Sequence, residues 1–234
     1  MTTTATTTGN GARADMRLFW ACFIALVATS FIFGVRANTI GELQNAFNLS
    51  EAQKGNINGV GMWPFALSII VFSLIIDKIG YKTAAIFAVA CHTVSLILTL
   101  RATGYESLYW STFLVAVANG TVEAFINPVV ATLFSKEKSK WLNILHAGWP
   151  AGLALGALFT LLFAESGWQV KFGLCFIPVV IYAFLILPRK FPVNERVAAG
   201  VSYRDMLGQV GGIGFFAIGA LFFAAVMQML NQPA

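Results

Sequence analysis

The sequence has few charged residues, and this shortage restricts the class of protein. Asp, Glu, Lys and Arg make up 11% of the 234 residues, against about 25% in a soluble globular domain. Cysteine is also scarce. Cys22, Cys91 and Cys175 are the three in the chain, and they lack the spacing of a disulfide framework or a zinc site. We expect them to be small core residues. The composition therefore argues against a soluble domain and against a cysteine-stapled fold.

The motifs of intramembrane enzymes are absent too. The sequence contains no His-Glu-x-x-His metal pair, no paired catalytic aspartates and no Gly-x-Ser-x-Gly nucleophile elbow. Residues 210–230 contain no lysine that could form a Schiff base with retinal. We therefore expect neither an enzyme nor a light sensor, and we expect no cofactor and no metal.

What the chain has in abundance is apolar sequence. Hydrophobic residues make up 58% of it, and the mean hydropathy is +0.75. They gather in runs close to the ~20 residues that a helix needs to cross a bilayer. Since runs this long and unbroken favour helices over a barrel, we predict an all-α integral membrane protein. The predicted spanning helices lie at residues 18–35, 57–76, 83–100, 108–134, 142–164, 172–187 and 210–230. The sixth run is short and contains Pro178, so its helix is expected to begin earlier, near Trp168.

Composition also divides the chain into segments. Residues 1–16 are polar and rich in threonine, so we predict a disordered tail and not a signal peptide. Residues 17–188 contain six of the apolar runs, which we predict to form one bundle. Residues 189–209 carry six charges and are predicted to be a linker to the seventh helix, at 210–230. That helix would open a second bundle, so we expect a truncated product or a fragment.

Positive charges are distributed unevenly between the loops. Cytoplasmic loops carry the excess of Lys and Arg in membrane proteins, which here predicts a cytoplasmic N-terminus in a plasma membrane or bacterial inner membrane. Lys54, Arg101 and Lys171 fall on the opposite side, with Arg36 at the outer end of the first helix. The pI near 9.3 then reflects topology and not nucleic-acid binding. The cytoplasmic cations are Arg13, Arg17, Lys78, Lys82, Lys136, Lys138, Lys140, Arg189, Lys190, Arg196 and Arg204.

One acid interrupts the apolar run at 108–134. A carboxylate at the centre of the bilayer costs at least ~2.5–3.5 kcal/mol, and Glu123 is the only acid within this run. Asn119 and Asn127 lie four residues to either side, so a helix places all three on one face. This pattern predicts a site that binds a solute or carries a proton. The alternative is a polar stripe that hydrogen-bonds neighbouring helices, with the acid kept neutral.

Glycine and proline predict how the helices pack and bend. Gly148, Gly152 and Gly156 recur every four residues, a spacing that lets two helix backbones approach closely. Pro64 and Pro150 lie inside the second and fifth runs. Each removes one backbone donor and is expected to kink its helix.

The loop after the second run resembles a signature of the major facilitator superfamily, Gly-x-x-x-Asp-Arg/Lys-x-Gly-x-Lys/Arg. Residues 73–82 read SLIIDKIGYK, so Asp77, Lys78, Gly80 and Lys82 match and Ser73 replaces the leading glycine. Gly80 permits a tight reversal. The resemblance implies that this motif latches two halves of a transporter together on the cytoplasmic side, with a second transporter half as the partner. A charged turn without a gating role is the alternative.

Two further segments are similar to the fucose-permease-like sugar–proton symporters of that superfamily. They are GTVEAFINP at 120–128 and LNILH at 142–146. In that group the glutamate lines the central cavity and takes part in proton or sugar handling. The resemblance implies this role for Glu123, and cavity lining for Asn127, Asn143 and His146. The group's fucose permease also has an acid on its first helix, whereas the corresponding stretch here, residues 34–47, is shorter and has Arg36, Asn38 and Glu42 instead.

A sugar presents hydroxyl groups and apolar ring faces, so its site needs amide and carboxylate partners and an aromatic ring. We expect Glu123 to bind the proton and to donate a hydrogen bond to the solute while neutral, because burial disfavours its charged form. His92 alone also fits a core histidine with satisfied hydrogen bonds. The candidate solute-binding residues are Asn119, Asn127, Asn143, His146, Trp149, His92 and Gln228.

Together these patterns predict a secondary active transporter in the lipid bilayer. It would move a small polar solute, a sugar by resemblance, through proton-coupled alternating access, with its site near the bilayer midplane. The alternatives are a truncated membrane protein that does not transport, a binding or sensory module, or a homodimer that replaces the second half.

Overall fold

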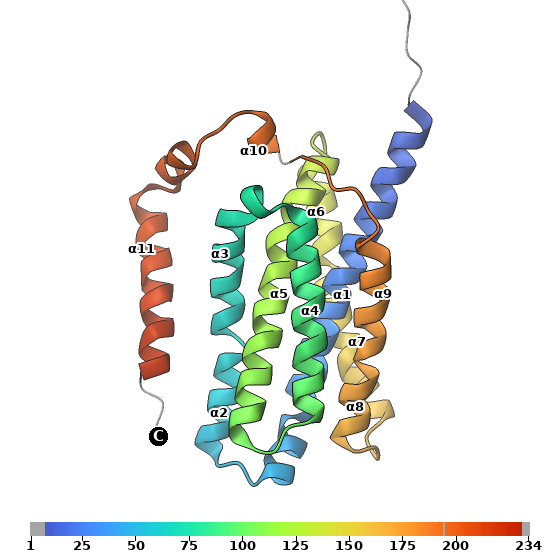
Figure 1. Cartoon of the computed structure of the whole chain (residues 1–234), viewed down its shortest axis with the longest axis vertical. Coiled ribbons are helices and arrows are strands. Elements are labelled where there is room, and N and C mark those ends of the chain that lie inside the picture. Colours follow the sequence, from blue (N-terminus) through green and yellow to red (C-terminus); the bar gives the residue numbers. More distant parts are fainter. Residues whose placement is uncertain (1–7, 194, 231–234) are drawn as a thin grey trace, which may run out of the picture.

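The computed structural model describes residues 8–193 and 195–230, and these ranges contain helices and no strand. Six helical segments in them are long and apolar enough to cross a membrane, and they run alternately up and down the molecule (Figure 1). The all-α membrane fold is thus confirmed, as is the early start of the sixth segment at Trp168. The six spans are Met16–Phe47, Glu51–Ile79, Tyr81–Leu100, Tyr105–Leu133, Lys138–Leu162 and Trp168–Ile186.

Three of the spans are single helices and three are divided. The single helices are α1 (Thr8–Phe47), α4 (Tyr81–Leu100) and α5 (Tyr105–Leu133). The second span consists of α2 (Glu51–Val60) and α3 (Trp63–Ile79), and the fifth consists of α6 (Lys138–His146) and α7 (Gly148–Leu162). The sixth consists of α8 (Trp168–Leu174) and α9 (Phe176–Ile186).

Each division follows from a proline. A proline has no backbone N–H, so the carbonyl four residues before it loses its helical hydrogen bond. Helices α2, α6 and α8 end at Val60, His146 and Leu174. These residues lie four positions before Pro64, Pro150 and Pro178. The expected kinks therefore occur as breaks of the helix. Helix α5 in contrast continues through Pro128.

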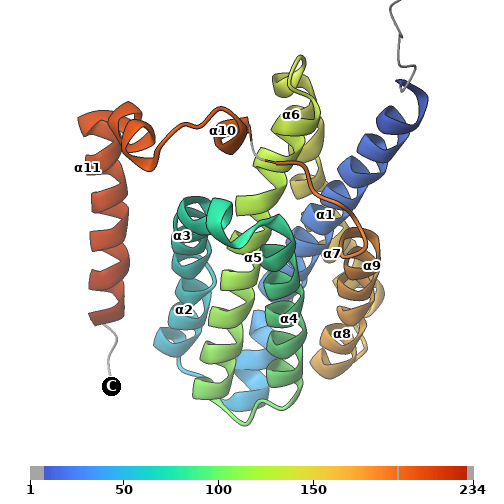
Figure 2. The ribbon, with the colours of Figure 1, turned by 45° about the horizontal axis from the view of Figure 1, so that its top comes forward.

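The spans form two groups that meet through α1 and α5. Helix α1 packs against α7 and α9, and α5 packs against α3 and α4. Contacts between α1 and α5 join the two groups, and α4 also contacts α8 and α9. Figures 1 and 2 show the arrangement of these helices in the bundle. Cys22, Cys91 and Cys175 are free thiols buried in this core, as the sequence predicts.

Glycine sets the distance between α1 and α7. A Cβ atom at Gly152 would overlap Ser30 Oγ and would lie 2.5 Å from the Val27 carbonyl oxygen of α1. At Gly156 it would lie 2.7 Å from the Phe31 carbonyl oxygen. Small residues allow this close approach of two backbones. Gly120 has the same function between α5 and α3, where a Cβ would overlap the carbonyl oxygen of Phe65.

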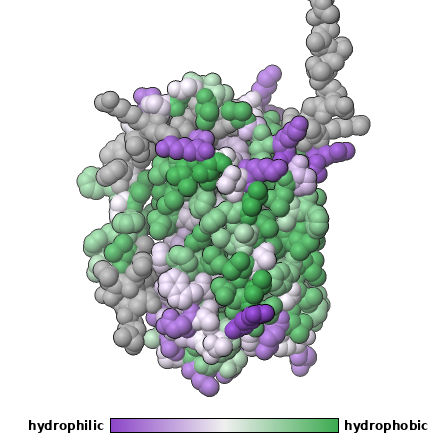
Figure 3. Space-filling model, in the orientation of Figure 1, coloured by the Kyte–Doolittle hydropathy of each residue, from purple (hydrophilic) through white to green (hydrophobic). Residues whose placement is uncertain are grey.

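The surface of the bundle matches a bilayer. Hydrophobic side chains cover the middle of the molecule, and hydrophilic side chains gather toward its two ends (Figure 3). The turn between α3 and α4 and the chain after α9 lie at the same end as the start of α1 (Figure 1). That end therefore carries Lys78, Lys82, Arg189 and Lys190.

Two segments lie outside the bundle. After α9 the chain forms the short α10 (Glu195–Ala198) and then α11 (Tyr203–Leu230), which stands to one side of α3 (Figures 1 and 2). Helix α11 begins seven residues before the predicted seventh helix at 210–230. At the other end of the chain, α1 begins at Thr8, inside the segment 1–16 that the sequence predicts to be a tail. Residues 1–7 of that segment are outside the described ranges.

The packing of α1 on α7 generates a first prediction. Gly152→Ala forces a methyl group into the backbone of α1, so we expect the free energy of unfolding to fall by about 1–3 kcal/mol. Thermal unfolding in detergent measures the effect. Gly173→Ala is the matched control, because a Cβ there meets nothing within 4 Å. Equal stability of the two variants would contradict the close contact between α1 and α7.

Candidate functional site

Glu123 lies on α5 with 8% of its surface exposed. Asn127, one turn further along the helix, donates from Nδ2 to Glu123 Oε2 over 3.0 Å and to the Glu123 carbonyl oxygen over 3.0 Å. The Oδ1 atom of Asn127 is buried and has no hydrogen-bond partner. A buried acceptor without a partner is rare in a folded protein. The pair therefore combines an acid with an amide oxygen that can still accept a hydrogen bond.

One side of this pair opens to the surface of the bundle. His146, at the end of α6, interacts electrostatically with Glu123 and is exposed. Asn143, one turn earlier on α6, is exposed as well. The structure thus brings Glu123 and Asn127 into contact, with His146 nearby, and leaves Asn143 exposed on α6. Glu123 lies among helices and is still within reach of the surface at α6.

Asn119 and His92 form a different arrangement. His92 on α4 is fully buried, and its Nε2 atom lies 2.8 Å from Asn119 Oδ1. Its Nδ1 atom lies 2.7 Å from the hydroxyl oxygen of Tyr182 on α9. If Asn119 Oδ1 accepts, Nε2 carries the proton and Nδ1 accepts from Tyr182, so a neutral imidazole satisfies both partners. These three residues tie α4, α5 and α9 together.

Trp149 belongs to an aromatic cluster. Its ring centroid lies 6.1 Å from that of Phe33 on α1 and 5.7 Å from that of Phe65 on α3. Both distances are within the range of favourable ring contacts. All three rings are half-buried, so the cluster spans α1, α3 and α7 one turn away from His146. The side chain of Gln228, the remaining candidate, lies outside the described part of the chain.

Sequence reasoning places Arg36 at the end of a membrane helix, but the structure places it within one. Helix α1 continues to Phe47. The Arg36 guanidinium donates to Thr112 Oγ1 over 2.8 Å, to Thr99 Oγ1 over 2.5 Å and to Ser95 Oγ over 3.3 Å. Its Nε atom is buried without an acceptor. The signal that sequence reasoning missed is that no proline follows the apolar run at 18–35 before Phe47.

Arg36 lines a small cavity of about 60 Å³ between α1, α2 and α5. Thr112 and Asn119 of α5 line the cavity too, as do Phe33 of α1 and Asn58 of α2. Thr112 precedes Glu123 by eleven residues, so Arg36 and Glu123 are separated by about 16 Å along α5 at 1.5 Å per residue. They do not form an ion pair.

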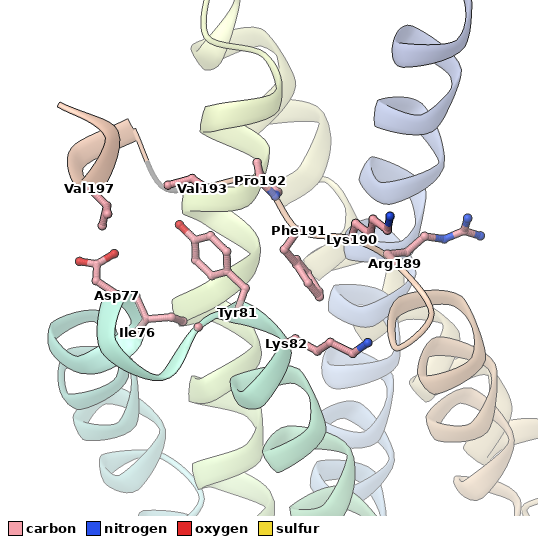
Figure 4. A pocket seen from close by; sticks show the side chains of 11 residues that line it. Ile76, Asp77, Tyr81, Lys82, Arg189, Lys190, Phe191, Pro192, Val193 and Val197 are labelled. Carbon is pink, nitrogen blue, oxygen red and sulfur yellow. The ribbon is translucent and has the colours of Figure 1, made fainter.

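The residues of the signature loop lie at the end of the bundle that carries the start of α1. Gly80 adopts φ 80° and ψ 150°, a left-handed backbone that favours glycine, and it links α3 directly to α4. Asp77, Tyr81 and Lys82 line a cavity of about 370 Å³ with the chain after α9. Figure 4 shows Asp77 pointing toward α10 and Phe191 beside Tyr81. Lys78 is the neighbour of Asp77 in the last turn of α3.

Two comparisons with known proteins bear on this arrangement. The family model of the Major Facilitator Superfamily matches residues 18–232. A gentisate transporter from Corynebacterium glutamicum is 25% identical over 168 residues, which are 70% of this chain and 38% of the relative. The matched part of the chain therefore corresponds to well under half the length of that relative. Within the described residues, no group of three His, Cys, Asp or Glu side chains could hold a metal ion.

The bond between Tyr182 and His92 generates a second prediction. Tyr182→Phe leaves Nδ1 of a fully buried histidine without a partner, which costs about 1–3 kcal/mol. We therefore expect a lower unfolding temperature in detergent for this variant than for the wild type. Tyr109→Phe on α5 is the matched control, since the Tyr109 hydroxyl makes no hydrogen bond within the described residues. Equal unfolding temperatures for the two variants would contradict a structural role for the bond.

Proposed function

The chain belongs to the Major Facilitator Superfamily, and on that premise we propose that it forms the proton- and solute-binding part of a secondary transporter. The observation that carries the proposal is the position of Glu123. This acid is almost buried at mid-helix in a membrane bundle, hydrogen-bonded to Asn127 and near the exposed His146. An intramembrane acid beside an accessible face is typical of proton relays in transporters.

The chemistry follows from the surroundings of the carboxyl group. Apolar neighbours disfavour an ionised carboxylate, so Glu123 is protonated while the site faces the side with the higher proton concentration. The neutral acid donates a hydrogen bond to the solute, and the Oδ1 atom of Asn127 accepts one. When the site faces the cytoplasm, Glu123 loses its proton, its donor disappears and the solute leaves. His146 stabilises the carboxylate in that state.

The signature loop contributes to the movement that exposes the solute site first to one side of the membrane and then to the other. We propose that Asp77, Lys78, Gly80 and Lys82 lie on the cytoplasmic side, in a plasma membrane or bacterial inner membrane, and contact a second transporter half there. The cations at the same end of the bundle favour this orientation. A second half packed on the face that bears Glu123 would alternately open and cover the site.

Two classes of solute fit this face. A sugar, the class that the sequence resemblance implies, would place its hydroxyl groups on Asn127 and Glu123 and an apolar ring face on Trp149. A hydroxylated aromatic acid would use the same groups and would add a negative charge. The second class is favoured by Arg36 and by the gentisate named for the relative in Corynebacterium glutamicum. A membrane protein that binds its solute without moving it is the functional alternative.

The role of Glu123 generates a third prediction. Glu123→Gln keeps the size and the donor of the side chain but cannot release a proton, so we expect proton-driven accumulation to fall at least about tenfold, within the range for loss of an essential proton-transfer group. Uptake of a panel of radiolabelled sugars and aromatic acids into proteoliposomes, with the product of the whole gene, measures the effect with and without a pH gradient.

Glu106→Gln is the matched control, because Glu106 is an exposed acid in the first turn of the same helix. It should accumulate solute like the wild type. Coupled accumulation by Glu123→Gln at the wild-type level would remove Glu123 from the mechanism. Binding by the wild type without any uptake would favour the non-transporting alternative.

A further inference from the structure

Arg36 carries a positive charge that nothing in the described part of the chain neutralises. Its three hydrogen-bond acceptors are hydroxyl groups, and its guanidinium carbon lies 5.2 Å from the ring centroid of Phe172. The acid that follows on the same helix, Glu42, is bound to Lys171 of α8. The Arg36 side chain is partly exposed, but its Nε atom is buried, and a charge with limited access to water is destabilising when it has no partner. A cation retained under these conditions suggests that an anion completes the site.

The hydroxyl groups around Arg36 are held in one orientation. Thr99 donates its own hydrogen to the Ser95 carbonyl oxygen over 2.9 Å, and Thr112 donates to that of Leu108 over 2.7 Å. Ser95 donates to the Ser111 carbonyl oxygen over 2.7 Å. Because each hydrogen is engaged with the backbone, each oxygen presents a lone pair to the guanidinium. The arrangement fixes the position of the arginine without cancelling its charge.

The guanidinium retains donors for a further partner. It has five N–H groups, and the contacts with Thr112, Thr99 and Ser95 use three of them. Nε is one of those left over, buried and without an acceptor. The cavity beside Arg36, at about 60 Å³, has room for a carboxylate group but not for a whole solute. Asn119 lines it as well, and since its Oδ1 faces His92, its NH2 group is the donor that remains.

Aromatic side chains lie between this cavity and the residues around Glu123. Phe33 lines the cavity and contacts Trp149. His146 lies three residues before Trp149 in the chain, and it interacts electrostatically with Glu123. Arg36 and Glu123 are about 16 Å apart along α5, which is more than the length of a single aromatic ring with its substituents. A solute that moves from Arg36 toward Glu123 therefore meets a cation first, then aromatic rings and then a hydrogen-bonding acid. These suit in turn the carboxylate, the ring face and the hydroxyl groups of an aromatic acid.

We propose that Arg36 binds the carboxylate of an aromatic acid and that its cavity is the anion-recognition end of the solute site. The inference rests on the proposed function, because it takes the face between α1, α5 and α7 as the solute path. It selects the aromatic acid from the two solute classes, since a neutral sugar leaves the Arg36 charge uncompensated. Movement of the acid with one proton from Glu123 transfers no net charge.

The fourth prediction compares two probes of similar shape, one of which is charged and the other neutral. Benzoate and benzamide have the same ring and similar shapes, but only benzoate carries a carboxylate. We expect the wild-type protein, reconstituted in lipid nanodiscs, to bind radiolabelled benzoate at least about tenfold more tightly than benzamide, as the loss of one charge-assisted contact predicts. Arg36→Gln should abolish this preference, Arg36→Lys should retain part of it, and the exposed control Arg101→Gln should retain all of it.

A purely structural role of Arg36 would change stability without changing the preference for an anion. Equal affinity of the wild type for the two probes, absence of benzoate binding, or an undiminished preference in Arg36→Gln would each overturn the proposal. If Arg36→Gln does not fold, the proposal is tested by the affinities of the wild type and of Arg36→Lys for the two probes. A preference of Arg36→Lys for benzoate over benzamide supports a charge interaction. Glu123→Gln separates the two proposals, because it should lose proton coupling and keep the preference for benzoate.

Discussion

The structure depends on the fact that hydrocarbon offers no hydrogen-bond partner to a polar group. Buried polar side chains in this bundle therefore bind one another or the backbone. His92 uses both ring nitrogens within the core, and the hydroxyl groups around Arg36 donate to backbone carbonyl oxygens. Thr29 Oγ1 and Trp63 Nε1 depart from this pattern, and so do Arg36 Nε and Asn127 Oδ1. The last two belong to the face proposed for the solute, one as a donor and the other as an acceptor.

Close helix packing determines where that face lies. Glycines at 152 and 156 bring α7 against α1, and Gly120 brings α3 against α5. The flanking helices are thereby drawn in beside α1 and α5, which carry Arg36 and Glu123. Because α1 and α5 are unbroken and packed on both sides, the spacing of the two functional side chains is set by rigid elements. The aromatic cluster of Phe33, Phe65 and Trp149 fills the space between the flanking helices.

The sequence predicts the membrane fold well, because a long apolar run in lipid satisfies its backbone hydrogen bonds by forming a helix. It also identifies Glu123, since an acid within such a run stands out. It does not reveal that Asn119 turns toward His92 while Asn127 turns toward Glu123, because all three positions of the stripe share one helical spacing. That choice depends on Tyr182 and His146, which are distant in sequence. The sequence also does not reveal the partners of Arg36, because its hydroxyl acceptors lie on two other helices.

The three proline breaks have a mechanical consequence. The second and fifth spans, which flank the solute face, each carry a joint near mid-membrane, at Gly61–Met62 and at Ala147. The two spans that hold Arg36 and Glu123 have no such joint. The two helices of each divided span, α2 with α3 and α6 with α7, can therefore tilt independently of each other. One half of the solute path can then widen while α1 and α5 keep Arg36 and Glu123 at a fixed separation.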